Sequence, residues 1–201
     1  MKTEKGKLIV ISGPSGAGKS TVVFKALEKR NDTCFSISAT TRKPRPNEVD
    51  GKEYFFVEPD RFKEMIANDE LLEHAEYVAN FYGTPKKYVE DCLNEGKNVL
   101  LDIEVQGAKQ IKEKMPEAVM IFVIPPSLKE LENRLRGRGT DSELKIQARL
   151  IRASQEYREA TFYDYIIINS DAETAAKEFD SIITAERCRA AERQHFLAEA
   201  L

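Results

Sequence analysis

The chain has 201 residues, of which 41% are hydrophobic, enough for one globular domain or for a core that carries small inserted subdomains. Lys and Arg number 31 against 34 Asp and Glu, which gives a formal net charge of −3. This balance argues against a chain built to coat nucleic acid or an anionic membrane. We therefore expect neither partner, and we expect basic residues to act locally.

The cysteines and histidines do not suggest a disulfide framework or a metal site. Cys34, Cys92 and Cys188 are odd in number and form no C-x-x-C pair, and His74 and His195 lie far apart in sequence. No run approaches the ~18 apolar residues of a membrane span, and the basic start leads into a strand instead of a signal peptide. These features predict a cytoplasmic protein with reduced cysteines.

The first predicted elements enclose the most specific motif of the chain. A short apolar strand over 7–11 and a helix over 21–30 flank the run Gly13-Pro14-Ser15-Gly16-Ala17-Gly18-Lys19-Ser20. This run fits the phosphate-loop pattern G-x-x-x-x-G-K-[ST] at every fixed position. Its glycines allow a tight turn in which backbone N–H groups and the helix N-terminus face a polyphosphate. The motif predicts a nucleoside triphosphate site that includes Thr21, with Lys19 on the β- and γ-phosphates and the Ser20 hydroxyl on Mg²⁺.

The next stretch is predicted to be less regular. Residues 34–39 form a second short strand, after which Pro44 and Pro46 exclude a helix or a central strand. Thr84 is predicted to be the N-cap of a helix with Pro85 at its first position. The other elements of this stretch are a turn over 48–52, a strand over 53–57, a helix over 60–68, an extended or mixed segment over 71–78, and the end of the Pro85 helix near Asn94.

The second half alternates strands and helices. Ser127 and Glu130 form a capping-box pattern, and Asp141 and Asp171 are predicted to start helices. The elements are strands over 98–102, 118–124 and 165–169, and helices over 106–114, 127–136, 141–161 and 171–200.

The continuous apolar strands that precede helices predict an α/β fold: a P-loop NTPase-type parallel sheet flanked by helices. Such a sheet binds ligands at the carboxyl ends of its strands, so the phosphate loop and Asp102 are predicted to face one crevice. Asp102 is then the predicted second Mg²⁺ residue, and Glu104 a further acid at the crevice mouth. The stretches 37–97 and 127–158 fit this pattern less well and are predicted to be insertions.

Arg42 and Arg45 lie in a proline-rich, extended segment where two guanidinium groups can bind one phosphate. Taken alone, an R-x-x-R sequence would fit a solvated basic loop better. What changes this interpretation is the set of motifs around it.

Those motifs resemble guanylate kinases. Ser38-Ala39-Thr40-Thr41-Arg42-Lys43-Pro44-Arg45, followed by Gly51-Lys52-Glu53-Tyr54, looks like the acceptor-binding segment of that family. The resemblance runs from about residue 8 to residue 169 and includes, in order, Glu73, the run 81–84, the run 101–107 and the run 134–139.

The resemblance implies roles for individual residues. Arg42, Arg45, Tyr54 and Tyr82 would hold the phosphate of GMP, and Ser38, Glu73, Thr84 and Glu104 would surround its guanine. In the lid, Arg134, Arg138 and Arg149 would contact phosphates, and Asn169 would lie near the adenine of ATP. The residues with implied catalytic roles are Lys19, Arg42, Arg134, Arg138 and Arg149. The chain departs from the common family pattern at Glu104, where Asp is frequent, and at Thr84, where Ser is frequent.

The guanine assignment has a chemical basis. Guanine presents N1–H and an exocyclic amine side by side, and one carboxylate such as Glu73 accepts both, whereas adenine has no such pair of donors. A buried carboxylate that is left unpaired by the wrong base discriminates strongly.

The resemblance implies a guanylate kinase that transfers the γ-phosphoryl group of ATP to GMP, and also to dGMP. It implies an ATP-binding core of residues 1–36, 98–126 and 159–201, a GMP-binding subdomain over 37–97 and a helical lid over 127–158. No general base is needed, because a phosphate monoester with a second pKa of about 6 is already anionic at neutral pH.

Two alternatives remain: a non-catalytic interaction module of the same fold, and a same-fold kinase with another phosphorylated acceptor. Lys19 and Arg42 argue against the first, and Glu73 with Ser38 against the second. The choice between monomer and homo-oligomer stays open.

Overall fold

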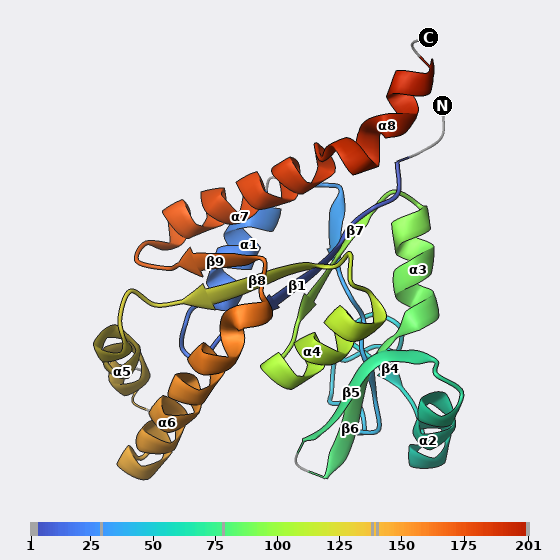
Figure 1. Ribbon diagram of the computed structural model, residues 1–201. Coiled ribbons are helices and arrows are strands. Elements are labelled where there is room, and N and C mark those ends of the chain that lie inside the picture. The colour runs from blue at the N-terminus through green and yellow to red at the C-terminus, as the bar shows by residue number, and fades with distance from the viewer. Residues whose placement is uncertain (1–3, 29, 78, 138, 140, 200–201) are drawn as a thin grey trace. The chain divides into compact units, whose positions relative to one another are not determined.

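The computed structural model describes residues 4–28, 30–77, 79–137, 139 and 141–199. The chain divides into two compact units, Met1–Ile9 with Asp32–Ala118 and Val10–Asn31 with Val119–Leu201. Figure 1 labels their helices and strands. The fold is α/β, as the sequence predicts.

The larger sheet has five strands in the order β2-β7-β1-β8-β9. Strand β1 contributes residues to both units. Strand β2 runs parallel to β7 with Cys34 opposite Val99, and β8 runs parallel to β9 with Ile121 opposite Tyr165. Every residue of β1 is buried, as expected of a strand covered on both faces. The strands are β1 (Leu8–Ser12), β2 (Thr33–Phe35), β7 (Asn98–Asp102), β8 (Val119–Ile124) and β9 (Tyr165–Ile168).

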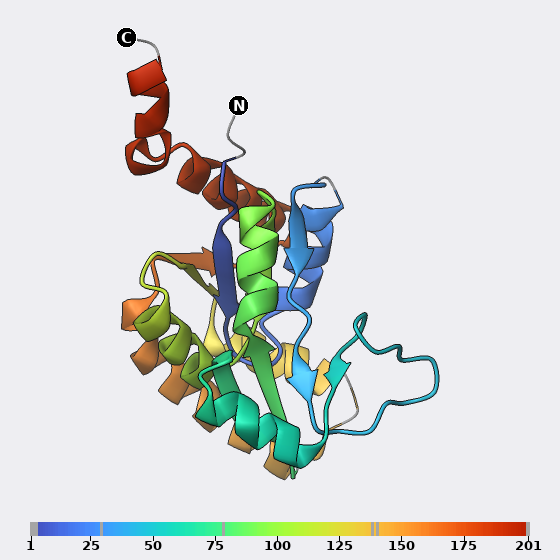
Figure 2. The same ribbon diagram turned by 90° about the vertical axis from the view of Figure 1, so that its right-hand side faces the viewer.

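The first unit also contains a four-stranded sheet in the order β4-β3-β6-β5. Its strands are β3 (Ala39–Thr40), β4 (Phe55–Phe56), β5 (Leu71–Tyr77) and β6 (Asn80–Pro85), and its helices are α2 (Pro59–Ala67), α3 (Lys86–Asn94) and α4 (Val105–Lys114). Phe62 and Met65 of α2 pack with Ala39 and Leu71 in a buried cluster beneath this sheet. Residues 41–54, between β3 and β4, form the long cyan loop that Figure 2 shows.

Two predictions in this unit are wrong. The predicted single strand over 34–39 is two strands that belong to different sheets, because the chain leaves β2 at Phe35 and enters β3 at Ala39. Thr84 is not a helix cap: β6 continues through it to Pro85, and Pro85 itself is the N-cap of α3. The extended segment after Leu71 is confirmed as β5.

The helices of the second unit all follow β1 and the glycines of the phosphate loop in sequence. They are α1 (Lys19–Leu27), α5 (Leu128–Gly137), α6 (Glu143–Glu159), the 3₁₀ turn Ala160–Phe162, α7 (Ala172–Arg187) and α8 (Ala190–Glu199). Helix α1 packs along α7, and α5 packs on α6 (Figure 1). The α5–α6 contact is a small apolar core of Leu131, Leu135, Ile146 and Ala153.

Helix starts in this unit follow the predicted caps in part. The Asp171 side chain accepts the Thr174 N–H, and the Ser127 hydroxyl accepts the Glu130 N–H at 3.0 Å. The predicted cap Asp141 is wrong, because Ser142 is the N-cap of α6. The predicted final helix over 171–200 is two helices that separate after Arg187.

No helix within the described ranges combines the length and the apolar composition that crossing a membrane requires.

Candidate active site

The phosphate loop depends on glycine at two close backbone approaches. Gly13 has a φ of 144°, and a Cβ there would lie 2.1 Å from the carbonyl oxygen of Val123. Gly18 has a φ of 87°, and a Cβ there would lie 2.4 Å from Asn169 Nδ2. Both positions therefore exclude larger residues, for steric as well as conformational reasons. Gly18 is the N-cap of α1, so Lys19, Ser20 and Thr21 form the first helical turn.

Lys19 folds back across the loop that precedes it. Its Nζ donates a 2.7 Å hydrogen bond to the Gly13 carbonyl. The bond between Ala17 N–H and the Pro14 carbonyl, at 3.0 Å, closes the turn between these residues. The loop thus directs an ammonium group and the N-terminus of a helix to the same place, an arrangement suited to a polyphosphate.

Arg134 and Asn169 both bind the carbonyl oxygen of Ala17. Asn169 is buried and donates from Nδ2 at 2.7 Å, and Arg134 donates from NH1 at 3.3 Å. Arg134 also donates to the Asn169 carbonyl at 2.9 Å and to Glu130 Oε1 at 2.8 Å. The structure therefore places these two predicted ATP-binding residues together, where both hold the phosphate loop through the Ala17 carbonyl.

Arg149 of α6 reaches the same loop from the predicted lid. Its NH1 donates to the Ser15 hydroxyl, and its NH2 lies 3.4 Å from Asp141 Oδ2. Arg138, the remaining predicted lid contact, lies outside the described residues.

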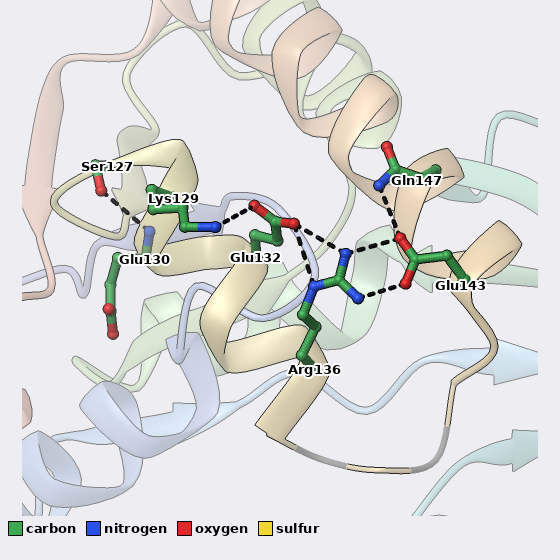
Figure 3. Close-up of polar contacts among 7 residues, drawn as sticks. All are labelled: Ser127, Lys129, Glu130, Glu132, Arg136, Glu143 and Gln147. Carbon is green, nitrogen blue, oxygen red and sulfur yellow. Dashed lines mark hydrogen bonds and ion pairs between the residues drawn. The ribbon is translucent and has the colours of Figure 1, made fainter.

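An ion network joins α5 and α6, the helices of the predicted lid (Figure 3). Arg136 of α5 donates to Glu132 Oε1 at 2.9 Å and to Glu143 Oε1 of α6 at 2.7 Å. Lys129 and Gln147 add further bonds to Glu132 and Glu143. The donors from Arg136 and Gln147 lower the pKa of Glu143 to about 2. Together with the apolar α5–α6 core, this network makes α5 and α6 one packed element.

The first unit contains a buried carboxylate. Only 6% of Glu73 is exposed, and the Thr84 hydroxyl donates to its Oε1 at 2.7 Å. The second oxygen faces Gly107, where a Cβ would approach Oε2 to 3.0 Å. Glu73 lies within a register shift of the β5–β6 pair, an irregularity of the kind that re-aims a side chain. Burial raises the pKa of Glu73, and the Thr84 bonds oppose that rise.

Arg42, Tyr54 and Tyr82 form a second group in this unit. The Arg42 guanidinium lies 5.3 Å from the ring centre of Tyr54, and the Tyr54 and Tyr82 rings meet edge to face at 6.1 Å. The hydrogen bond to Glu48 is the main cause that raises the pKa of Arg42, and a hydrogen bond with the Tyr82 side chain adds to the rise. Tyr82 and Thr84 are two residues apart on β6, so this group and the Glu73 group share one face of the sheet.

The other predicted acceptor residues are Arg45, Ser38 and Glu104, and Asp102 is the predicted magnesium residue of the same unit. The Arg45 side chain is exposed, and the Ser38 carbonyl accepts the Phe55 N–H at 2.9 Å beside β3. Asp102 is the exposed last residue of β7, and Glu104 is the exposed N-cap of α4.

Sequence reasoning missed Glu48, which binds Arg42 NH2 at 2.8 Å and the Arg45 N–H at 2.7 Å. The available signal was an acid placed three residues after Arg45, the spacing at which a side chain reaches back to a backbone N–H.

Comparison with known proteins decides the family. A family model described as "Guanylate kinase" matches residues 5–186. The chain belongs to the guanylate kinase family. The predicted resemblance is thereby confirmed and extends beyond both ends of the segment from 8 to 169.

Individual guanylate kinases are similar over nearly the whole chain. The one from Clostridioides difficile (strain 630) is 52% identical over 200 residues, 99% of this chain and 97% of the relative. The one from Lactococcus lactis subsp. lactis (strain IL1403) is 54% identical over 186 residues, 92% and 91% of the two chains. A crystal structure of guanylate kinase from Anaplasma phagocytophilum aligns with a TM-score of 0.71 at 37% identity, covering 94% of this chain and 90% of that one.

Proposed function

We propose that this chain is an ATP:GMP phosphotransferase, a guanylate kinase that converts ATP and GMP into ADP and GDP. The single observation that carries the acceptor assignment is Glu73: a buried carboxylate held by Thr84, in a chain whose relatives are named guanylate kinase. This activity belongs to purine nucleotide metabolism, and dGMP is an expected second acceptor because the proposed contacts lie on the base and the phosphate.

The donor site is the phosphate loop, Gly13 to Ser20, with Thr21. On binding ATP, the Lys19 ammonium exchanges its bond to the Gly13 carbonyl for the β- and γ-phosphates. Arg134 and Asn169 support the loop through Ala17 and border the adenine side, and Arg149 reaches the phosphates from α6. Arg138 is assigned to the same group from its sequence position alone.

The acceptor phosphate is assigned to Arg42, Arg45, Tyr54 and Tyr82. A guanidinium can bind two phosphate oxygens at once, and Arg42 is already oriented by its aromatic neighbours. The guanine is assigned to Glu73 and Thr84, with Ser38 and Glu104 at its border. The ionised Glu73 accepts both N1–H and the exocyclic amine, which leaves AMP without a matching pair of donors.

The types of the two proposed ligand residues, a hydroxyl and a carboxylate, suit a magnesium ion. Magnesium is usually held by one or two protein oxygen ligands, with waters and substrate phosphates completing its shell. The Ser20 hydroxyl and the Asp102 carboxylate are the proposed ligands. Among the described residues, no group of three or more His, Cys, Asp or Glu is arranged so that it could hold a metal ion by itself. When bound, the ion neutralises charge on the β- and γ-phosphates of ATP.

The chain's own work is therefore positioning and charge neutralisation. The GMP phosphate is ionised at neutral pH and attacks in line without a general base. Lys19, Arg42 and the lid arginines spread positive charge around the transferring group. In this proposal, residues 37–97 bind GMP and residues 127–158 form the lid. The ATP-binding core consists of residues 1–36, 98–126 and 159–201. We also propose that the protein acts in the cytoplasm.

A coupled ADP-release assay with GMP, dGMP, AMP, CMP and UMP tests the proposal. We expect GMP to be the preferred acceptor and AMP to be inactive at equal concentration. Preference for another monophosphate would overturn the acceptor assignment and favour the alternative of a same-fold kinase. ATP binding without turnover on any acceptor would favour an interaction module instead.

A further inference from the structure

One carboxylate binds both arginines of the proposed phosphate site through different oxygens. Glu48 Oε1 accepts from Arg42 NH2 at 2.8 Å, and Oε2 accepts the backbone N–H of Arg45 at 2.7 Å. The Glu48 N–H in turn donates to the Arg45 carbonyl at 3.1 Å, which closes the turn. Although the loop is at the surface, the Glu48 and Arg42 side chains are each only 16% exposed.

We propose that Glu48 is a positioning residue for the acceptor phosphate. It holds the Arg42 guanidinium and the Arg45 backbone in the arrangement that receives the phosphate of GMP. This inference rests on the proposed function, since it assigns a role within the same acceptor site.

The contacts of Arg42 show how its orientation is fixed. Its NH1 donates to the Lys43 carbonyl at 2.9 Å, while its NH2 is bound to Glu48. The rings of Tyr54 and Phe56 lie 5.3 and 5.8 Å from its central carbon. Each terminal nitrogen thus has one partner within the loop, and the aromatic rings restrict the plane of the group. Of these contacts, only Glu48 also binds Arg45.

The loop needs such a connection because residues 41–54 form neither helix nor strand, apart from an isolated bridge between Asp50 and Tyr54. Fixing a backbone without regular hydrogen bonds costs conformational entropy, and a binding loop that is ordered beforehand avoids that cost when its ligand arrives. Glu48 supplies both a side-chain and a backbone constraint from one residue.

Two effects of the Glu48 charge oppose each other. The negative charge of Glu48 partly cancels the positive charge of Arg42 that attracts a phosphate dianion. On this ground alone, its removal would strengthen GMP binding. By positioning, its removal releases Arg42 and the turn at Arg45, so GMP binding would weaken. Solvent and salt reduce part of the charge effect in a loop at the surface, whereas lost pre-organisation is not screened. We therefore expect the positioning effect to prevail.

The same loop supplies a matched control. Glu53 Oε2 accepts the backbone N–H of Val49 at 2.7 Å, so this carboxylate also braces the loop but through Val49 instead of the arginines. Glu48→Gln and Glu53→Gln remove the same charge from the same loop. Glu48→Asp retains the charge with a shorter reach.

The first test measures KM and kcat for GMP at saturating ATP. We expect Glu48→Gln to raise the KM for GMP about tenfold, the loss of one charge-assisted hydrogen bond. The KM for ATP should stay unchanged, Glu48→Asp should recover part of the loss, and Glu53→Gln should match the parent chain. An unchanged or lower KM for GMP in Glu48→Gln would overturn the inference. Absence of GMP turnover in the parent chain and in Glu53→Gln would instead overturn the proposed function.

The second test does not depend on activity. Trypsin does not cut before proline, so Lys43 and Arg45 are protected and the cleavable bonds of the loop follow Arg42 and Lys52. If Glu48 orders the loop, Glu48→Gln should be cut after Arg42 several-fold faster than Glu53→Gln, and GMP should protect the parent chain. Equal cleavage rates in the two variants would contradict the positioning role, even if turnover were affected.

Discussion

Thr84 Oγ1 donates to Glu73 Oε1 at 2.7 Å between the paired strands β5 and β6. The bond joins a hydroxyl and a carboxylate that are both buried, and it leaves Oε2 on the side of Gly107. Burying a carboxylate is costly unless hydrogen bonds compensate. Thr84 therefore stabilises the charge that the proposed guanine contact requires.

We expect Thr84→Val, which keeps the shape but removes the hydroxyl, to destabilise the fold by about 1–3 kcal/mol, because Glu73 Oε1 loses a partner in a buried environment. The KM for GMP should rise, while Thr84→Ser should retain both stability and KM. Urea unfolding and GMP titration of the three proteins would check this. Equal losses in Thr84→Val and Thr84→Ser would show that packing, and not the hydroxyl, matters.

The pKa of Glu73 predicts a pH effect on GMP binding. Because burial raises the pKa of this carboxyl above its usual value of 4.5, protonation in the folded protein begins at a higher pH than for an exposed glutamate. In the proposed complex GMP binds the ionised form of Glu73, so GMP binding should weaken as pH falls through the raised pKa, and it should be fully present above it. The measurement is the pH dependence of GMP affinity in the parent chain and in Glu73→Gln. Identical profiles in both would contradict the assignment, since the phosphate of GMP titrates equally with each.

Lys19→Met should abolish most turnover with little change in stability. The lysine makes one bond, to the Gly13 carbonyl, at the edge of a loop that is also held by Arg134 and Asn169. Losing the ammonium removes the positive charge that the proposed mechanism places beside the transferring phosphoryl group. We expect kcat to fall by about 100- to 1,000-fold. Single-turnover assays with ATP and GMP, together with thermal unfolding, would separate the two effects. A variant that retains full kcat would exclude the proposed role.

Arg134→Met should behave differently, because the Arg134 guanidinium is hydrogen-bonded to other groups of the protein. It donates to Ala17, Asn169 and Glu130, so its removal should lower stability by about 1.5–3 kcal/mol and raise the KM for ATP. Asn169→Leu, which removes the other bond to Ala17, should produce the same pair of changes. Loss of kcat with unchanged stability and unchanged KM would instead assign Arg134 to the transferring phosphate.

The stabilising effect of the ion network between α5 and α6 should be sensitive to salt (Figure 3). Arg136→Met removes bonds to both Glu132 and Glu143, and we expect the melting temperature to fall at low ionic strength. The difference from the parent chain should shrink at high salt, because these side chains are solvent-accessible and screened. Lys129→Met, which removes only the bond to Glu132, is the control for charge. A fall in melting temperature that does not depend on salt would indicate that the methylene groups of Arg136 contribute through packing.

Local patterns predicted much of the fold. The phosphate loop, the buried strands β1, β7 and β8 and the Asp171 cap each depend on residues adjacent in sequence, and all three are confirmed. The prediction of a strand buried on both faces is wrong for β9, the last strand in the sheet order, where Ile166 and Ile168 are exposed. The division of 34–39 between two sheets was not predictable from period or propensity, because nothing in Ser36-Ile37-Ser38 marks a break. The helix break after Arg187 likewise has neither Pro nor Gly near it.

The site residues likewise combine features that the sequence predicts with contacts that only the folded chain reveals. Glu73 and Thr84 were named from a resemblance, but the hydrogen bond that joins them depends on a register shift that sequence alone does not reveal. The phosphate contact of Arg134 stays a prediction, and its additional bond to the Ala17 carbonyl requires α5 to pack against the loop, which no local pattern reveals. For Glu48, the spacing from Arg45 is a local signal, but the bond to the Arg42 side chain depends on the folded loop.

The short connection between β2 and β3 restricts how this chain can change length. Its first residue donates from Ser36 N to the Leu100 carbonyl at 2.9 Å, and its last accepts at the Ser38 carbonyl from Phe55 N at 2.9 Å. With both ends hydrogen-bonded to different sheets, one added residue would reverse which side chains of β3 point inward. We therefore expect this connection to reject insertions and deletions, so that size variation tolerated during evolution accumulates elsewhere along the polypeptide.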